Sequence, residues 1–446
     1  MPVRQPGQTT APSLNSTFGS EGQPPLVLAW LFPRTDGPTL ELSPGRGVAV
    51  LGRDADVTVV LEGSDVSRRH ASITCEGHQV ILRDLDSRNG TYVNGRKVKS
   101  TVLSENDVVR IGGWVGVVTR ESGPLGSLAP GLFGGGVLRA ALSAAERAAA
   151  SDLPIVLEGE TGTGKEAVSR AVHGWSKRGG PFVAVNCAAL PEALAEGELF
   201  GYRRGAFTGA EQASLGHFRA AQRGTLLLDE ICELKLPLQA KLLRVLEQRE
   251  VQPLGESTPV KLDVRVLAAA QEPLSRAVQE GRFRADLYAR LDGVTLRLPP
   301  LRERRAEIPY LFTRLLLEQA GARPPTVDVR VVERLCLYDW PFNVRELALL
   351  VKRLLVLHGA EPLLKPQHLP ERMQQEAPVE VSRTPAKPTA PDKLELPHLL
   401  SALRESGGNV AKAAALLGIS RQRAYRMMQA HPEVDLDSLR DQGDEA

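Results

Sequence analysis

The chain lacks several features that would mark particular classes of protein. Its 446 residues include four cysteines, spread far apart with no Cys-x-x-Cys pair. This argues against a disulfide framework or a zinc site and is typical of a reducing cytosol. No apolar stretch opens the chain, and its longest uncharged run, residues 123–138, is broken by glycine and proline. We therefore expect neither a signal peptide nor a membrane span, and we expect a cytoplasmic protein.

The chain also lacks a large excess of positive or negative charge. Lysine and arginine number 55, and aspartate and glutamate number 53. A protein that coats nucleic acid through a bulk positive field is therefore not expected. Any contact with DNA must come from a local group of residues.

Changes in composition divide the chain into about three domains, the number expected for this length. Short β-branched runs separated by turns predict an all-β sandwich, and strand-like runs that alternate with helical stretches predict a doubly wound α/β core. The predicted order is a disordered terminus (1–24), the β domain (25–120), a linker (121–133), the α/β domain (134–372), a second linker (373–393), an all-α domain (394–432) and a tail (433–446).

A glycine-rich sequence, GETGTGKE, follows a predicted strand at residues 154–158 and precedes a helix. Glycines there let backbone N–H groups point at phosphate oxygens, and the lysine places its charge on the outer phosphates. Without the flanking strand and helix, an ordinary turn would be the alternative. The predicted nucleotide-binding residues are Gly159, Glu160, Thr161, Gly162, Thr163, Gly164, Lys165 and Glu166, the last where Ser or Thr usually meets Mg²⁺.

A second run, TLLLDE at residues 225–230, ends in two carboxylates. Asp229 suits coordination of Mg²⁺ through water, and Glu230 suits polarisation of the water that attacks phosphorus. An acidic cap at a strand end is the alternative, which the glycine-rich loop makes the weaker one. Together the two motifs predict a site for a phosphate chain and Mg²⁺; the family resemblance given next implies that the phosphate compound is ATP.

Nine motifs of the α/β domain occur in the order found in one known family. They are GETGTGKE, NCAAL (186–190), ELFG (198–201), GAFTGA (205–210), GTLLLDE (224–230), LLRVLE (242–247), FRADLYARL (283–291), LPPLRER (298–304) and WPFNVREL (340–347). The domain thereby resembles the bacterial enhancer-binding proteins, the AAA+ ATPases that activate sigma-54 RNA polymerase. The GAFTGA motif is found almost only in that family. The resemblance implies a helical lid and a homo-oligomer that goes from dimers to a hexameric ring.

Three further residues gain catalytic roles from this resemblance. Asn186 resembles the switch partner that hydrogen-bonds the catalytic glutamate, here Glu230. Arg284 and Arg290 resemble arginine fingers offered to the ATP of a neighbouring subunit, where a cation supplied in trans stabilises charge on the transferring phosphoryl group. Without the resemblance, two arginines so spaced would be taken for solvated surface charges.

In the lid, Arg345 resembles the family's sensor arginine. Two other positions depart from the family pattern. Gln271 stands where the family motif AATN has asparagine, so a longer side chain must act as the sensor residue. Phe342 stands where the family motif WPGN has glycine. The first departure bears on the rate of hydrolysis and the second on motion of the lid.

The neutral GAFTGA sequence places one large aromatic side chain between glycines. Glycines free the backbone to swing, and an exposed aromatic gains binding energy when a partner desolvates it. By resemblance that partner is sigma-54, and the predicted contact residues are Gly205, Ala206, Phe207, Thr208, Gly209 and Ala210. The alternative is that Phe207 packs against its own domain.

The all-α domain is predicted to be a helix-turn-helix. Alanines within residues 411–415 let two helices cross closely, Gly418 permits the turn, and Ser420 can cap the next helix. The stretch resembles the Fis-type helix-turn-helix of enhancer-binding proteins; a helical hairpin for dimerisation is the alternative. The predicted residues for binding double-stranded upstream DNA are Ser420, Arg421, Gln422, Arg423 and Arg426, with Gln422 and Arg423 on base edges.

Four short motifs, LGR (51–53), SRRH (67–70), SRNGT (87–91) and VNG (93–95), are spread through the β domain. They resemble the forkhead-associated (FHA) domain, which reads phosphothreonine. The expected partner is a phosphothreonine-containing protein or a Ser/Thr kinase, and a purely structural sandwich is the alternative. The predicted phosphopeptide-binding residues are Arg53, Ser67, Arg68, Arg88 and Asn89; His70 is expected to brace the loop.

These motifs together predict a transcriptional activator. A kinase signal would be read at the amino end, DNA bound at the carboxyl end, and ATP hydrolysed by a ring between them. Two other functions stay open. One is a phosphothreonine-reading scaffold with a weak ATPase, supported only by Gln271 and Phe342. The other is an AAA+ DNA translocase or helicase, which gives no reason for Phe207 in a neutral loop.

Overall fold

The computed structural model of the chain describes residues 25–374, apart from 46, 77–78, 121–122, 208–209 and 322–323, together with Val410. The chain divides into two units, Met1–Val381 and Ser382–Ala446. Apart from Val410, the predicted helix-turn-helix lies outside the described residues. Among the residues that are described, no helix has both the length and the apolar character needed to cross a membrane.

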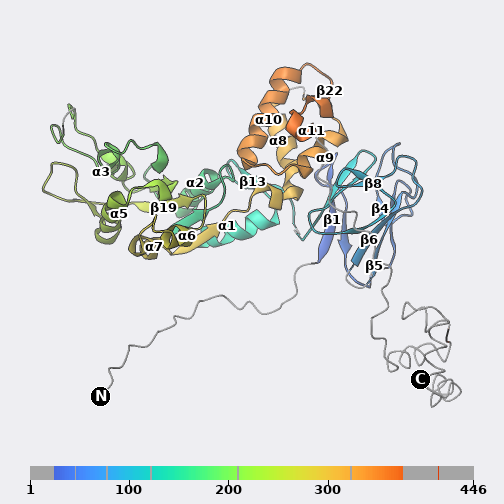
Figure 1. Ribbon diagram of the computed structural model, residues 1–446, viewed down its shortest axis with the longest axis horizontal. Helices are drawn as coiled ribbons and strands as arrows, with labels where there is room; N and C mark the ends of the chain where they lie inside the picture. Colours follow the sequence, from blue (N-terminus) through green and yellow to red (C-terminus); the bar gives the residue numbers. More distant parts are fainter. Residues whose placement is uncertain are drawn as a thin grey trace, which may run out of the picture. The chain divides into compact units, whose positions relative to one another are not determined.

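Two mainly antiparallel sheets form the β domain (Figure 1). The first contains β1 (Leu26–Phe32), β2 (Thr39–Leu42), β7 (Thr91–Val93), β8 (Arg96–Val98), β10 (Val108–Ile111) and β11 (Trp114–Thr119), in the order β2-β1-β11-β10-β7-β8. The second contains β3 (Ala49–Gly52), β4 (Val59–Val60), β5 (Ala71–Glu76), β6 (Gln79–Asp84) and β9 (Ser100–Leu103), in the order β4-β3-β5-β6-β9. Trp30, Leu51, Leu82 and Ile111 are buried in one core, which confirms the predicted sandwich.

Part of the predicted linker at residues 121–133 is instead a hairpin. Strands β12 (Gly126–Ala129) and β13 (Leu132–Gly134) pair antiparallel. Ala129 and Leu132 are buried in a core of the α/β domain. The glycine and proline content indicated a linker, but the apolar residues between them cover helices of the next domain. The linker prediction is wrong for this segment.

Five parallel strands form the sheet of the α/β domain. They are β14 (Ile155–Glu158), β15 (Phe182–Asn186), β16 (Thr225–Asp229), β19 (Arg265–Ala270) and β20 (Val294–Arg297), in the order β15-β16-β19-β14-β20. On one face pack α1 (Gly136–Ala149) and α2 (Lys165–Ser176); on the other pack α3 (Ala195–Phe200), α4 (Gly216–Ala220), α5 (Leu236–Gln248), α6 (Leu274–Gln279) and α7 (Ala285–Leu291). A short pair, β17 (Glu250–Val251) and β18 (Val260–Lys261), follows α5.

The strands are apolar along their length because both faces of the sheet are buried. Leu157 faces the core that contains α1 and α2, and its neighbour Val156 faces the opposite core. This alternation between two apolar environments is typical of a parallel sheet covered on both sides. The predicted doubly wound α/β core is confirmed.

A helical lid follows the sheet (Figure 1). Its elements are α8 (Ile308–Ala320), α9 (Val329–Leu337), α10 (Asn343–His358), α11 (Glu371–Gln374), the strands β21 (Thr326–Val327) and β22 (Leu363–Leu364), and the 3-10 turns η3 (Leu301–Glu303), η4 (Arg305–Glu307) and η5 (Pro366–His368). In α10, Leu347, Leu350, Val351 and Leu354 recur at helical spacing and are buried. They pack with Trp340 and Phe312, both fully buried, in the core of the lid.

Candidate nucleotide site and partner-binding surfaces

The carboxyl ends of the parallel strands bring the predicted nucleotide residues to one edge of the sheet. Strand β14 leads into the loop at residues 159–164, β16 ends at Asp229, and β19 ends at Ala270, next to Gln271. In open α/β sheets, ligands bind at this edge because the loops that follow the strands converge there.

The glycine-rich loop has the backbone geometry that its glycines permit. Gly162 and Gly164 have φ of 79° and 104°, in the left-handed region that other residues rarely adopt. Lys165, the first residue of α2, donates from Nζ to the carbonyl oxygens of Gly159 at 2.6 Å and Glu160 at 3.1 Å. The ammonium group is thus held across the loop.

Opposite charges face each other beside this loop. Burial lowers the pKa of Lys165, while the charges of Asp229 and Glu230 act against that shift. Burial raises the pKa of Asp229, and Lys165 acts against it. One oxygen of Asp229 accepts a hydrogen bond from the backbone N of Glu230 at 3.0 Å. An ammonium beside a half-buried carboxylate fits a phosphate chain and a Mg²⁺ ion held through water.

The carboxylate of Glu230 is held by Gln271, not by Asn186. Nε2 of Gln271 donates to Oε1 of Glu230 at 2.7 Å. The side chain of Asn186 instead caps η1 (Cys187–Ala189), accepting from the backbone N of Ala188 at 2.8 Å. The expectation that Asn186 bonds Glu230 is therefore corrected for this structure. The side-chain oxygen of Asn186 is occupied by the backbone N–H of Ala188. The longer side chain of Gln271 reaches the carboxylate of Glu230 instead.

The lid contacts the loop through two residues that sequence reasoning did not single out. Nδ2 of the buried Asn343 donates to the carbonyl oxygen of Thr161 at 3.0 Å and to Glu160 at 3.2 Å. Its Oδ1 accepts from the backbone N of Leu301 at 2.7 Å. Arg302 forms two hydrogen bonds to Glu160, at 2.6 and 2.8 Å. Both residues lie within motifs that carry the family resemblance, which was the available signal.

The lid also reaches the loop at Gly162. A β carbon added there would lie 2.2 Å from the carbonyl oxygen of Phe342 and 3.0 Å from Cβ of Arg345. Burial lowers the pKa of Lys165, and the positive charge of Arg345 adds to that shift. Phe342 is 57% exposed, so its backbone and not its ring makes this contact.

Arg284 and Arg290 make their contacts with residues other than the nucleotide loop of their own chain. Arg284 pairs with Asp286 at 2.7 Å, and Arg290 donates to a backbone carbonyl of α5 at 3.2 Å. Arg290 also lines a cavity with Pro154, which precedes β14, and with the first residues of β19. It therefore lies toward the amino ends of the strands. No hydrogen bond or ion pair in the described part of the chain joins either arginine to residues 159–164.

A backbone hydrogen bond joins the two ends of the GAFTGA segment, and the ring of Phe207 is exposed. The backbone N of Gly205 donates to the carbonyl oxygen of Ala210 at 2.9 Å. The ring of Phe207 lies edge-on to Tyr202, with 5.0 Å between ring centroids, and 36% of Phe207 is exposed. Phe207 thus has a contact in its own domain and an open face as well. Thr208 and Gly209 lie outside the described residues.

The predicted phosphopeptide residues meet on three neighbouring loops of the FHA-like sandwich. The backbone N of Arg53 donates to the carbonyl oxygen of Ser67 at 3.1 Å, and Oγ of Ser67 accepts from the backbone N of Arg88 at 3.1 Å. Arg53, Arg68 and Arg88 are exposed. Three exposed arginines thus lie on loops joined through Ser67, and guanidinium groups suit the binding of a phosphate.

Two side chains brace these loops from within. Nδ2 of Asn89, a predicted phosphopeptide-binding residue, donates to the carbonyl oxygen of Asp65 at 2.7 Å and so bonds its own chain. His70 is fully buried; its Nδ1 accepts from the backbone N of Ser67 at 3.1 Å, and its Nε2 lies 3.3 Å from the carbonyl oxygen of Gly90. Burial lowers the pKa of His70. A neutral ring protonated at Nε2 satisfies both contacts, so His70 is a brace, as expected.

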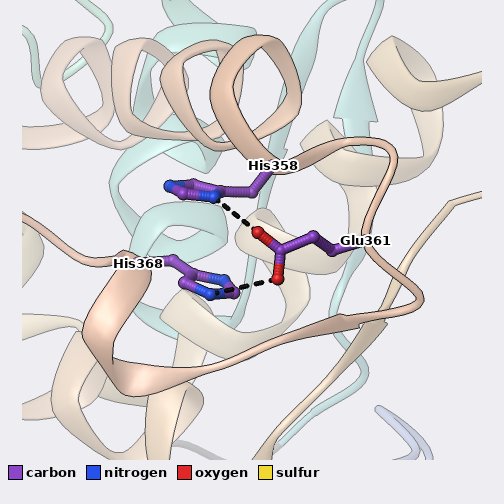
Figure 2. A group of neighbouring side chains, drawn as sticks. All are labelled: His358, Glu361 and His368. Carbon is purple, nitrogen blue, oxygen red and sulfur yellow. Dashed lines mark hydrogen bonds and ion pairs between the residues drawn. The ribbon is translucent and has the colours of Figure 1, made fainter.

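A cluster of His358, Glu361 and His368 lies at the end of α10 (Figure 2). Glu361 bridges the two rings, at 2.8 Å from Nδ1 of His358 and 3.2 Å from Nε2 of His368. The rings are stacked, with 4.1 Å between centroids and 9° between planes. An imidazole nitrogen offers its lone pair in the plane of its ring, and two stacked parallel planes share no position for one ion. The cluster therefore fits a clamp between α10 and η5 and does not fit a metal site.

Family models match four parts of the chain. The sigma-54 interaction domain matches residues 135–297, the AAA+ ATPase lid domain 302–386, the FHA domain 49–112, and the Fis family of bacterial regulatory proteins 390–430. The last match includes the predicted DNA-binding residues Ser420, Arg421, Gln422, Arg423 and Arg426, all outside the described residues. The fold, the site and the family models define an AAA+ ATPase with an FHA domain, and the Fis-family match adds a helix-turn-helix.

Similarity to individual proteins identifies the family within this class. Transcriptional regulatory protein GlrR of Escherichia coli (strain K12) is 38% identical over 304 residues, 67% of either chain. Regulatory protein AtoC of the same organism is 39% identical over 297 residues, 64% of this chain and 63% of AtoC. The crystal structure of NtrX from Brucella abortus in complex with ATP matches with a TM-score of 0.50 at 30% identity, over 70% of this chain and 69% of NtrX. The chain belongs to the family of sigma-54-dependent transcriptional activators and spans about two thirds of the length of these relatives.

Proposed function

We propose that this protein uses ATP hydrolysis to remodel sigma-54 RNA polymerase so that promoter DNA opens. The observation that carries the proposal is Phe207, an aromatic residue within the neutral sequence at residues 205–210 of an AAA+ core, with 36% of its surface exposed. Such a ring gains binding energy when a partner removes it from water. Membership of the sigma-54 activator family supports sigma-54 as that partner.

ATP with Mg²⁺ is the proposed cofactor. The loop at residues 159–164 and the start of α2 would hold the phosphates, with Lys165 on the outer oxygens. Asp229 would hold Mg²⁺ through water, and the ion supplies neutralisation of phosphate charge. Glu230 would polarise the attacking water, its carboxylate turned by the 2.7 Å hydrogen bond from Gln271. NtrX, a structural neighbour, holds ATP in its crystal structure.

Hydrolysis is proposed to depend on a neighbouring copy. The geometry that supports this is the position of Arg284 and Arg290, which have no bond to the loop of their own chain among the described residues. A cation supplied in trans would stabilise the transferring phosphoryl group only after assembly, from dimers toward a ring. ATP turnover would then follow oligomer formation.

Two further surfaces would decide where and when the ATPase acts. The exposed arginines around Ser67 would bind phosphothreonine on a partner protein or a Ser/Thr kinase. The helix-turn-helix at residues 394–432 would bind upstream double-stranded DNA, with Gln422 and Arg423 on base edges. Phosphothreonine binding would thus be joined to promoter opening in one chain.

Promoter opening tests the proposal directly. The full chain, sigma-54 polymerase and ATP are combined on a template with an upstream site for the helix-turn-helix, and melted bases are detected with permanganate. We expect Phe207→Ala to hydrolyse ATP and to lose melting by about tenfold or more, because the desolvated aromatic contact is gone. The matched control is Leu215→Ala, which removes another exposed apolar side chain, 58% exposed. Equal melting by wild type and Phe207→Ala would contradict the proposed role of this loop.

A further inference from the structure

One strand of the FHA domain is buried on both of its faces. All six residues of β11 are buried, although a strand at the surface of a sandwich normally leaves one face to water. Trp114 and Val118 face the core of the sandwich. Val115 instead joins the core of the lid, and Val117 packs against Ala306 in η4. The lid therefore covers the outer face of this FHA sheet.

A buried ion pair fixes this contact. Nε of Arg110, on β10, lies 2.7 Å from Oε2 of Glu333, on α9, and the two side chains are 14% and 5% exposed. The guanidinium also stacks on Tyr92, 3.7 Å from the ring centroid. Burial raises the pKa of Glu333, and Arg110 acts against that shift. A buried pair is costly to break when one partner is removed, so it favours one docked orientation over others.

Helix α9 also leads to the nucleotide loop. After α9 the chain turns through Trp340, which is fully buried and donates from Nε1 to the carbonyl oxygen of Leu335 at 2.8 Å. Trp340 and Asn343 have φ of 52° and 53°. A non-glycine residue keeps this left-handed conformation only where the surrounding packing enforces it. Asn343 then bonds the loop through Thr161 at 3.0 Å. One rigid connection thus runs from the FHA contact to the nucleotide site.

The phosphopeptide loops touch the hairpin that carries Arg110. Gly112 lies in the turn between β10 and β11, and a β carbon added there would lie 2.9 Å from the carboxylate of Asp65. The carbonyl oxygen of Asp65 in turn accepts from Asn89 at 2.7 Å. A shift of these loops when a ligand binds would therefore act on the β10–β11 hairpin directly.

We propose that the lid is the docking surface of the FHA domain, and that α9 couples a ligand on the FHA loops to a nucleotide on residues 159–164. The inference rests on the proposed function, because it takes phosphothreonine and nucleotide as the two ligands. Coupling between two binding sites is reciprocal, so each ligand changes the affinity for the other by the same factor. Arg110 and Glu333 are positioning residues here, since neither belongs to a ligand site.

The first measurement is the affinity of the full chain for N-methylanthraniloyl-ADP, a fluorescent nucleotide. We expect Arg110→Ala and Glu333→Gln each to weaken binding by about fivefold or more, because an undocked FHA domain leaves α9 less constrained. The matched control is Arg83→Ala, which breaks an exposed pair with Glu76 at 3.6 Å on the other FHA sheet. Its affinity is expected to stay within about twofold of wild type. Unfolding midpoints of all variants show whether each one folds.

The outcomes separate the coupling from the function on which it rests. If wild type binds the nucleotide and folded Arg110→Ala and Glu333→Gln bind it equally well, the coupling is wrong and nucleotide binding stands. If wild type does not bind the nucleotide, both the coupling and the proposed nucleotide binding are wrong. A degenerate phosphothreonine peptide library, with its unphosphorylated twin as control, must also bind wild type differently with and without ADP. Unchanged peptide affinity would overturn the coupling, while peptide that does not bind at all would overturn the phosphothreonine function too.

Discussion

At the scale of single residues, the catalytic edge is set by one strained position and one long side chain. Glu230 has φ of 54° directly after β16, a left-handed conformation that costs a non-glycine residue about 1 kcal/mol or more. The bond from Gln271, at 2.7 Å, holds the carboxylate of this turned residue. Gln271 therefore makes the contact with Glu230 that the resemblance assigned to Asn186, and we propose that it orients the carboxylate.

This arrangement gives opposite expectations for two amide side chains. Gln271→Ala is expected to lower kcat for ATP by roughly tenfold to a hundredfold and to leave ADP affinity within about threefold, because the proposed base loses its orientation. Asn186→Ala removes a turn cap and is expected to lower the free energy of unfolding by about 1 kcal/mol with a smaller effect on kcat. The measurements are ATP turnover over a range of concentrations, ADP titration and urea unfolding. A larger loss of kcat in Asn186→Ala would return the orienting role to Asn186.

At the scale of elements, the sequence predicts what is encoded locally. The loop at residues 159–164 and the acidic end of β16 are each contained in a few adjacent residues, so their glycines and carboxylates identify them without a structure. The hairpin β12–β13 was missed because its apolar residues acquire a burial partner only after α1 and α2 form. The bond between Glu160 and Asn343 joins positions 183 residues apart. No local pattern predicts such a pair, although both lie in recognised motifs.

The turn between α9 and α10 gives a prediction at this scale. Asn343 combines a φ of 53° with three side-chain hydrogen bonds. Asn343→Gly keeps the backbone conformation and loses the bonds, so ADP affinity is expected to fall by about tenfold. Asn343→Ala loses the bonds and adds backbone strain, so its free energy of unfolding is expected to be about 1 kcal/mol lower still.

ADP titration and urea unfolding of the two Asn343 variants separate the side chain from the backbone. Equal stability of the alanine and glycine variants would mean that the turn relaxes out of the left-handed conformation. Unchanged ADP affinity in both would mean that the other contacts hold the loop without Asn343. These are the pair of Arg302 with Glu160 and the bond from the backbone N of Val344 to the carbonyl oxygen of Gly162 at 3.0 Å.

At the scale of the whole molecule, the chain keeps its proposed catalytic groups in two separate places. The nucleotide loop lies at the carboxyl ends of the strands, while Arg290 lines a cavity with Pro154 and the start of β19, toward the amino ends. A folded chain of fixed topology cannot bring these two edges of one sheet together. The distribution of these groups supports the proposal that one copy completes the site of another.

Mixing two inactive variants tests this division. Lys165→Ala removes the phosphate-binding charge and keeps Arg290; Arg290→Ala does the reverse. Each alone is expected to lose at least about 99% of ATP turnover, since a finger contributes about a thousandfold. An equimolar mixture is expected to regain roughly a quarter of wild-type activity, because one interface in four joins an intact loop to an intact finger. Turnover of the mixture equal to the sum of its parts would show that Arg290 does not act on a neighbour's ATP, and full activity of Arg290→Ala alone would remove it from the site.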